Sequence, residues 1–396
     1  ERASFGAARL RVSPLERFDT TLEHQQTLEG PKNDQTTLGA RYRVHPALAL
    51  EASGTTGTQG QSAQGGAVLS LGGGRIYLKE RVAEDRAGRS SSTVLGSETA
   101  VGPAGKVYSE YQWGHDPAGD RSLALLGTRW QKEIRKGLGA TLSGEYSEAD
   151  SAPGKVSRYT LAAGLSFADP RGIRASTHGE IREEDGAVRR VQLLTTNRLE
   201  LALSPGFTLL ARYRFSETKN RTLGTVEAGF EERTVGLAWR PVREDRLNAL
   251  AKYTQLFDRR AASPTDNTLL ENRRDVFSVE WSLELNRHLE WVTKEAVRLG
   301  KDSDMGWGTF SSRTWLSVNR LNVHVWKTID LGIEYRILHQ EETDTRRQGW
   351  LTELMWNVAE HMRVGVGYNF TDFSDNELSE NDYSVHGAFV RVQGTY

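Results

Sequence analysis

The chain contains no cysteine among its 396 residues. It therefore has no disulfide, no thiol nucleophile and no cysteine-based zinc or iron–sulfur site. It also lacks any hydrophobic run near the roughly 18 residues that a membrane-spanning helix needs, which excludes a helical membrane protein. The 51 basic and 52 acidic residues leave a formal net charge of -1. This balance indicates neither a nucleic-acid partner nor a polybasic membrane patch.

Proline is also scarce, and its ten positions divide the chain regularly. Because proline has no backbone N–H, it is excluded from central strands and marks turns. Six prolines lie in short breaks, namely Pro14, Pro46, Pro103, Pro170, Pro205 and Pro241. The other four fall in polar stretches about midway between those breaks, namely Pro31, Pro117, Pro153 and Pro264. With the proline-free breaks included, the short breaks recur about every 35 residues, which predicts a series of hairpins.

Between the breaks, apolar and polar residues alternate with period 2. In residues 362–370, Met362, Val364, Val366, Tyr368 and Phe370 share one face. The same pattern occurs in residues 277–285 and 329–337, and it is typical of strands with one apolar and one polar face. Residues 289–299 and 312–325 alternate poorly, and we interpret them as strands too.

A soluble sandwich also has alternating strands, so further features must distinguish the two cases. Aromatic residues lie near the ends of the apolar rows, as Trp350 and Trp356 do, which is typical of the girdles of membrane barrels. Many segments approach the roughly 9–11 residues that cross an outer membrane. Short turns and longer loops alternate as well. These features predict an all-β fold, a transmembrane antiparallel up-and-down β-barrel with short periplasmic turns and longer extracellular loops.

The C-terminus carries an alternating row that ends on an aromatic residue: Ala388, Val390, Val392, Gly394 and Tyr396. This row resembles the C-terminal signal by which bacterial outer-membrane barrels are recognised for insertion. The resemblance implies a place in the bacterial outer membrane and contact with its barrel assembly machinery. It also implies contact with the lipid bilayer and with lipopolysaccharide.

Two further segments carry a second resemblance. Residues 236–241, running into 245–253, and residues 367–373 resemble parts of the C-terminal barrels of large proteobacterial outer-membrane surface proteins. This resemblance implies location and architecture, and it implies no catalytic residue.

The strand count is about 22 to 24. The pattern contains 22 strands after Pro14 and one more before it, whereas bacterial single-chain barrels have even numbers. Either residues 1–12 are a periplasmic or lumenal extension of a 22-stranded barrel, or an earlier strand is missing and the whole has 24. We therefore divide the chain into residues 1–14, an N-terminal strand or extension, and residues 15–396, the barrel.

The polar face carries charges of both signs, which the barrel turns toward its lumen. The predicted lumen-facing charge cluster contains Arg174, Arg182, Arg212, Arg214, Glu280, Glu284, Asp330, Glu334 and Arg336. One interpretation is a hydrated wall in which opposite charges pair across strands. The other is a selectivity function, for which the four arginines between 174 and 214 would attract anions.

The sequence indicates no enzyme. Its nine histidines show no metal-ligand spacing, and no nucleophile motif or phosphate-binding loop is present. We therefore predict no catalytic residue, no metal and no cofactor.

The predicted function is a wide outer-membrane conduit that passes or encloses a larger substrate or partner protein as part of an envelope assembly. Barrels of about 22 strands are too wide for their wall side chains to fill, and they usually hold a plug. The residues per strand leave none for a plug domain, so we expect a plug or cargo protein in the lumen, either another chain or an absent N-terminal region. The alternative is a passive outer-membrane anchor for a large N-terminal or partner surface assembly.

Overall fold

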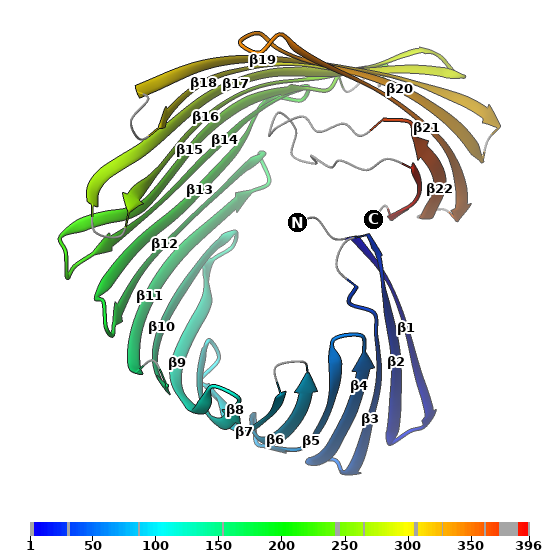
Figure 1. Cartoon of the computed structure of the whole chain (residues 1–396). Coiled ribbons are helices and arrows are strands. Elements are labelled where there is room, and N and C mark those ends of the chain that lie inside the picture. The colour runs from blue at the N-terminus through cyan, green and yellow to red at the C-terminus, as the bar shows by residue number, and fades with distance from the viewer. Residues whose placement is uncertain are drawn as a thin grey trace. The chain divides into compact units, whose positions relative to one another are not determined.

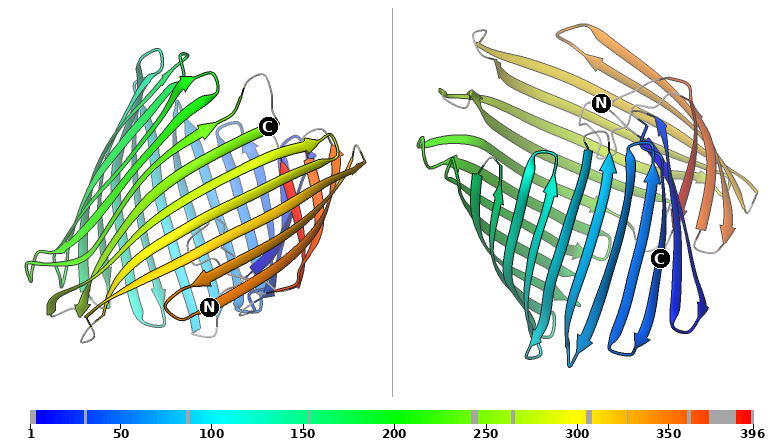
Figure 2. Two further views of the ribbon diagram at one scale, coloured as in Figure 1. Left: turned by 90° about the horizontal axis from the view of Figure 1, so that it is seen from above. Right: turned by 60° about the horizontal axis from the view of Figure 1, so that its bottom comes forward.

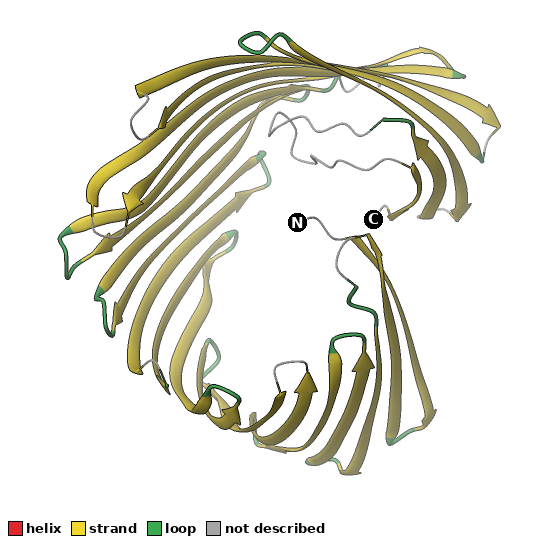
Figure 3. Cartoon of the chain, viewed as in Figure 1, coloured by secondary structure: helices red, strands yellow, loops and turns green. Residues whose placement is uncertain are grey.

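The computed structural model describes residues 4–29, 32–85, 88–152, 154–241, 246–263, 266–304, 308–326, 328–359, 362–371 and 387–394. Almost all of this chain is β-strand (Figure 3). No helix in these ranges could span a membrane.

Strands of the first half are β1 (Ser4–Leu15), β2 (Phe18–Glu29), β3 (Gln35–His45), β4 (Leu48–Gly57), β5 (Gly60–Leu71), β6 (Gly74–Asp85), β7 (Gly88–Val101), β8 (Gly105–Asp116), β9 (Gly119–Arg135), β10 (Leu138–Ser151), β11 (Gly154–Asp169) and β12 (Ile173–Asp185). Strands of the second half are β13 (Arg190–Ser204), β14 (Phe207–Asn220), β15 (Thr225–Trp239), β16 (Leu247–Ser263), β17 (Asp266–Asn286), β18 (Leu289–Asp304), β19 (Gly308–Trp326), β20 (Ile329–Gln340), β21 (Thr345–Ala359), β22 (Met362–Asn369) and β23 (Gly387–Gly394).

The described strands form one 23-stranded sheet, in which successive strands pair side by side (Figure 1). The pairing is antiparallel at both ends of the sheet, as between β1 and β2 and between β22 and β23. Turns join neighbouring strands at alternating ends (Figure 2). The predicted up-and-down order is therefore confirmed.

The chain divides into two units, which we describe separately. Unit 1 contains Glu1–Ile134, Gly139–Gly164 and Glu180–Val191, and it holds most of β1 to β10. Unit 2 contains Arg135–Leu138, Leu165–Gly179 and Gln192–Tyr396, and it holds β14 to β23.

The alternation of faces is confirmed by exposure. On one face of unit 2, Val366 is 55% exposed, Leu354 45% and Val279 42%. On the other face, Glu334 and Glu353 are buried. A soluble sheet has the opposite arrangement, because water drives apolar side chains inside. Large apolar side chains exposed along strand after strand instead suit a lipid solvent.

β18 and β19 are strands, as predicted despite their weak alternation. The weakness comes from polar residues on the apolar face. Trp291 Nε1 donates to Asn319 Oδ1 over 3.3 Å, and Asn319 Nδ2 donates to Ser317 Oγ over 3.0 Å. The Ser317 hydroxyl then donates to Glu295 Oε1 over 2.6 Å. These polar side chains form hydrogen bonds with one another across β18 and β19. The two strands therefore form although their apolar and polar residues do not alternate regularly.

The expected longer loops are partly taken up by the strands. β4 and β5 are joined by residues 58–59 alone, and β8 and β9 by residues 117–118 alone. β17 extends over 21 residues, about twice what a membrane crossing needs. Polar residues expected in loops therefore continue the strand ladders. Of the predicted loop prolines, Pro31, Pro153 and Pro264 lie outside the described residues.

The polar face of unit 1 contains a repeated arrangement of tyrosine, glycine and glutamate. Tyr77 on β6 crosses β7 to donate to Glu110 on β8, with its hydroxyl 2.6 Å from Oε2. The Tyr77 ring lies where a side chain at Gly96 would be. In the same way, Tyr108 crosses Gly127 to donate to Glu145. Each glycine leaves the space that lets a side chain reach the second strand away.

We therefore expect Gly96→Ala to lower the free energy of unfolding by about 1–3 kcal/mol, the usual cost of overpacking. The added Cβ would overlap the Tyr77 ring and displace it from Glu110. The measurement is urea unfolding of the protein in detergent micelles. Gly65→Ala on β5 is the control, because a Cβ there meets nothing within 4 Å. Equal effects of the two variants would contradict the packing described.

Candidate functional site on the inner face

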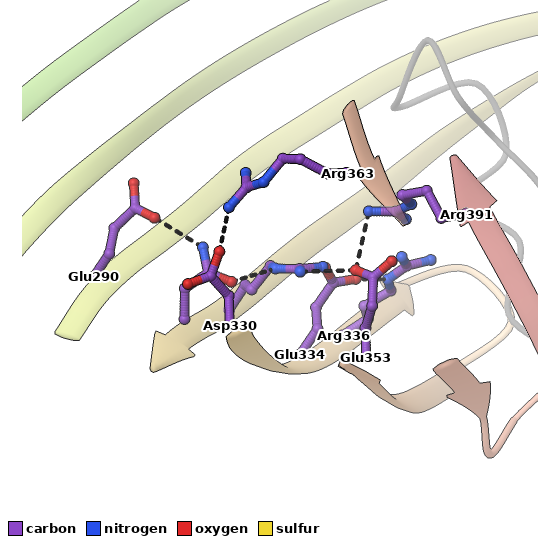
Figure 4. A network of polar contacts seen from close by, with 9 residues as sticks. Glu290, Asp330, Glu334, Arg336, Glu353, Arg363 and Arg391 are labelled. Atoms are coloured by element: carbon purple, nitrogen blue, oxygen red, sulfur yellow. Dashed lines mark hydrogen bonds and ion pairs between the residues drawn. The ribbon is translucent and has the colours of Figure 1, made fainter. Parts of the chain in front are cut away.

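The polar face of unit 2 bears a network of charges around Glu353 on β21. The Glu353 side chain is 0% exposed, and its Oε2 accepts hydrogen bonds from two guanidinium groups. Arg320 Nη2 on β19 donates over 2.8 Å, and Arg391 Nη1 on β23 donates over 3.0 Å. Both arginines reach across an intervening strand. The sheet of unit 2 is curved (Figure 1), and the side chains of this network point toward one another on its concave side (Figure 4). We name this side the inner face.

The network continues along β20. Asp330 pairs with Arg363 on β22 and lies 2.7 Å from Nδ1 of His324. Glu334 pairs with Arg336 two residues along the same strand. Asn322 donates to Glu290 over 2.8 Å and extends the network to β18 (Figure 4).

We name this group the C-terminal ion network. Its members are Arg320, Arg336, Arg363, Arg391, Glu290, Asp330, Glu334 and Glu353. Four positive and four negative side chains balance. Such a balanced and mostly paired set holds neighbouring and next-nearest strands together.

Local sequence explains why Arg320 can reach Glu353. Arg320 lies opposite Glu334, and Gly332 on β20 lies opposite Glu353. Gly332 has no side chain, so the Arg320 guanidinium lies over it. As with the tyrosines of unit 1, a long side chain passes over a glycine on the next strand to reach a glutamate on the second strand away.

A second feature of the inner face is a hollow of about 780 Å³ formed by β12 to β18. We name it the basic hollow. Its charged lining is Arg174, Arg198, Arg212, Lys252, Lys294, Glu200 and Glu280. Its remaining lining includes Leu210, Gly236 and Leu250. Five basic residues against two acidic ones make it electropositive, in contrast to the balanced network beside it.

The predicted charge cluster is divided among these features. Arg174, Arg212 and Glu280 line the basic hollow. Arg214 shares the buried Glu232 carboxylate with Arg212, its Nη2 lying 2.9 Å from Oε2. Arg182 belongs to unit 1, where it pairs with Glu180 over 2.8 Å.

The remaining predicted positions follow the same alternation. Asp330, Glu334 and Arg336 belong to the C-terminal ion network. Glu284 lies four residues beyond Glu280 on the same face of β17, and it is exposed. Each of the four arginines proposed as an anion patch has a carboxylate partner, so the pairing interpretation describes them well.

Sequence reasoning missed Arg198, Lys294 and Arg320. Arg320 and Lys294 lie in the two strands whose alternation is weak, so the sequence pattern did not assign them to a face. Cross-strand register supplies the missing signal, because Lys294 lies opposite Glu280 and Arg320 opposite Glu334.

The C-terminal row lies on β23. Val390 is 70% exposed, and Ala388 is exposed as well, whereas Arg391 turns to the inner face. Val392 pairs with Val364 in the ladder. Tyr396 lies outside the described residues, and the insertion signal stays a prediction. No group of histidine, aspartate and glutamate in the described ranges could hold a metal ion.

Comparison with known proteins decides the fold. No family model matches the chain, and no curated protein matches it. A ferric enterobactin receptor variant from Pseudomonas aeruginosa, solved with enterobactin, matches with a TM-score of 0.51 and 12% identity over 99% of this chain and 78% of that one. The chain has the fold of an outer-membrane β-barrel.

Two other solved structures are similar at lower scores. The siderophore receptor PirA from Pseudomonas aeruginosa has a TM-score of 0.49 and 10% identity, over 99% of this chain and 79% of that one. The alcaligin receptor FauA from Bordetella pertussis has a TM-score of 0.44 and 12% identity, over 99% and 73%. The predicted fold class is confirmed by the 23-stranded sheet of the described residues and by the match at a TM-score of 0.51, and the predicted outer-membrane localisation agrees with it. The apolar face is accordingly the lipid-facing one.

Proposed function

We propose that the chain is a wide outer-membrane conduit that passes or encloses a substrate or partner larger than a simple solute. The strand number supports this, since barrels of about 22 strands exceed what wall side chains fill. The observation that carries the proposal is the inner face of unit 2, where a charged wall surrounds the basic hollow. A purely structural wall would need no hollow of net positive charge.

The solved structure of similar fold supports the same class of function. It is named as a receptor and was solved in complex with enterobactin, so this fold is compatible with ligand binding. We propose that the lumen of the present chain is occupied in the cell by a plug or cargo protein. We also propose that the barrel assembly machinery inserts the chain by its C-terminal row and that its girdles contact lipopolysaccharide.

A passive anchor is the second candidate. It is favoured by residues 236–241, 245–253 and 367–373, whose sequences resemble parts of the C-terminal barrels of large surface proteins. An anchor needs the lipid-facing surface and gives no role to the charges of the inner face.

Planar-bilayer recording separates the two proposals. The purified barrel should give stepwise conductance, and Arg174→Gln with Arg198→Gln should shift its ion preference toward cations. The shift should be largest near 0.01 M salt, where the Debye length is about 30 Å, and it should vanish near 1 M. These substitutions remove two positive charges from the basic hollow and leave the lipid-facing surface intact.

The matched control removes two positive charges from the opposite face. Arg233→Gln with Arg273→Gln changes residues that are 60% and 56% exposed beside Glu231 and Asp275. This control should not alter ion preference. A barrel that gives no conductance steps, in a preparation shown to contain no second protein, would support the anchor.

A further inference from the structure

We infer that the basic hollow is a binding site for a multivalent organic anion, one that carries several carboxylate or phosphate groups on an apolar body. The inference deepens the proposed function by naming the chemical class of its ligand, and it rests on that function. Three observations carry it, namely the charge, the floor and the fixed arginine of the hollow.

Charge is the first observation. The inner face can neutralise its charges, as the C-terminal ion network does with four residues of each sign. The basic hollow differs in its balance of charge: Arg174 and Arg212 each pair with a carboxylate, but five basic and only two acidic side chains line the hollow. Like charges gathered on a concave wall repel one another and attract counter-ions, so they raise the local concentration of anions.

The floor of the hollow is the second observation. Gly236 lies between Leu210 and Leu250, and a Cβ at Gly236 would lie 3.8 Å from Leu210 Cβ and 3.7 Å from Leu250 Cδ1. The floor is therefore apolar, and the missing side chain at Gly236 leaves it open. A volume of about 780 Å³ falls within the range of roughly 300–1,000 Å³ that small-molecule sites occupy. An apolar floor under a charged rim suits an anion with an apolar body better than a hydrated inorganic ion.

Arg212 is the third observation. Its Nε donates to Glu232 Oε1 over 2.7 Å, and the Glu232 side chain is only 4% exposed. A buried carboxylate thus holds the guanidinium in place at the wall of the hollow. Pre-orientation of this kind lowers the entropic cost of binding a ligand group.

Calorimetric titration of the detergent-solubilised barrel tests the inference, with benzene-1,3,5-tricarboxylate as the probe. Lys252→Gln with Lys294→Gln should weaken binding by about tenfold or more, and high salt should weaken binding to the unchanged protein. The matched control is Lys79→Gln with Arg81→Gln on β6, which removes two positive charges from unit 1. The control should change affinity less than about twofold. Equal losses in both variants, or no binding by the unchanged barrel, would overturn the inference.

The second arm tests the floor. Gly236→Leu leaves every charge in place and fills the space between Leu210 and Leu250, so it should weaken tricarboxylate binding by about tenfold. Inorganic phosphate should bind more weakly than the tricarboxylate, and benzyltrimethylammonium should not compete. The organic-anion assignment would be overturned if phosphate bound as tightly as the tricarboxylate and Gly236→Leu did not weaken that binding. The site would then recognise charge alone.

A result that contradicts anion binding can be distinguished from one that contradicts the conduit. Binding is measured at equilibrium without current, whereas the conduit is tested by conductance. A barrel that conducts but does not bind the tricarboxylate overturns only the ligand assignment, and a barrel that binds but does not conduct overturns only the conduit.

Discussion

Glu353→Gln is expected to lower the free energy of unfolding by about 3 kcal/mol, because it removes the buried negative charge that two guanidinium groups share. Two guanidinium groups bind this carboxylate, and Arg320, whose side chain is only 17% exposed, would keep one carboxylate partner among the described residues, Glu334, whose Oε2 lies 3.5 Å away. Arg391 is 40% exposed and regains part of its solvation, which places the effect near the lower end of the range for buried pairs. The measurement is the urea midpoint of unfolding in detergent micelles or lipid vesicles.

Glu341→Gln is the matched control. Glu341 pairs with Arg313 at 50% and 57% exposure, and exposed pairs contribute about 0–1 kcal/mol. Raising the salt concentration should reduce the small loss of unfolding free energy caused by Glu341→Gln. It should leave most of the loss caused by Glu353→Gln. A loss at Glu353 no larger than that at Glu341 would show that the C-terminal ion network does not stabilise unit 2.

An arginine introduced on the lipid-facing surface should destabilise the barrel by about as much as Glu353→Gln does. Val366→Arg, or Val279→Arg, places a guanidinium in an apolar row of β22 or β17, at a position 55% or 42% exposed. Arginine at the bilayer midplane of a barrel costs about 2–4 kcal/mol. We expect poorer assembly in the outer membrane and loss of heat resistance on gels.

Ser282→Arg is the control for this second prediction, because it introduces the same side chain on β17 three residues from Val279 and on the inner face. Substitutions of lumen-facing positions do not meet lipid, so this variant should assemble normally. Normal assembly of both lipid-face variants would mean that these rows do not meet the bilayer core.

Strand alternation is where sequence reasoning was strongest. Residues 362–370 already assign Val366 to one face and Arg363 to the other, because successive side chains of a strand point to opposite sides. The structure places Val366 in the exposed row and Arg363 against Asp330. This local rule needs no knowledge of the neighbouring strands.

The same rule could not give the pairing of charges. Arg212 and Arg214 were assigned to the lumen, yet their shared partner Glu232 lies on the next strand. Which residue lies opposite depends on register, and register follows from turns and strand lengths that the pattern underestimated. The four arginines that one interpretation of the sequence placed in an anion patch therefore each have a carboxylate partner.

The sequence by itself determined the outer-membrane barrel architecture of this protein and the face on which most charged residues lie. The face of the charged residues follows from period-2 alternation, which is a property of each strand alone. The membrane barrel was predicted from further local features, the aromatic residues at the ends of the apolar rows and the length of the segments. Only the tertiary structure decided that Arg320 and Arg391 meet on Glu353, and that Gly236 opens the floor of a hollow lined by Lys252 and Lys294. Those arrangements combine side chains from several strands, and the register and curvature of the sheet bring them together, which no local pattern records.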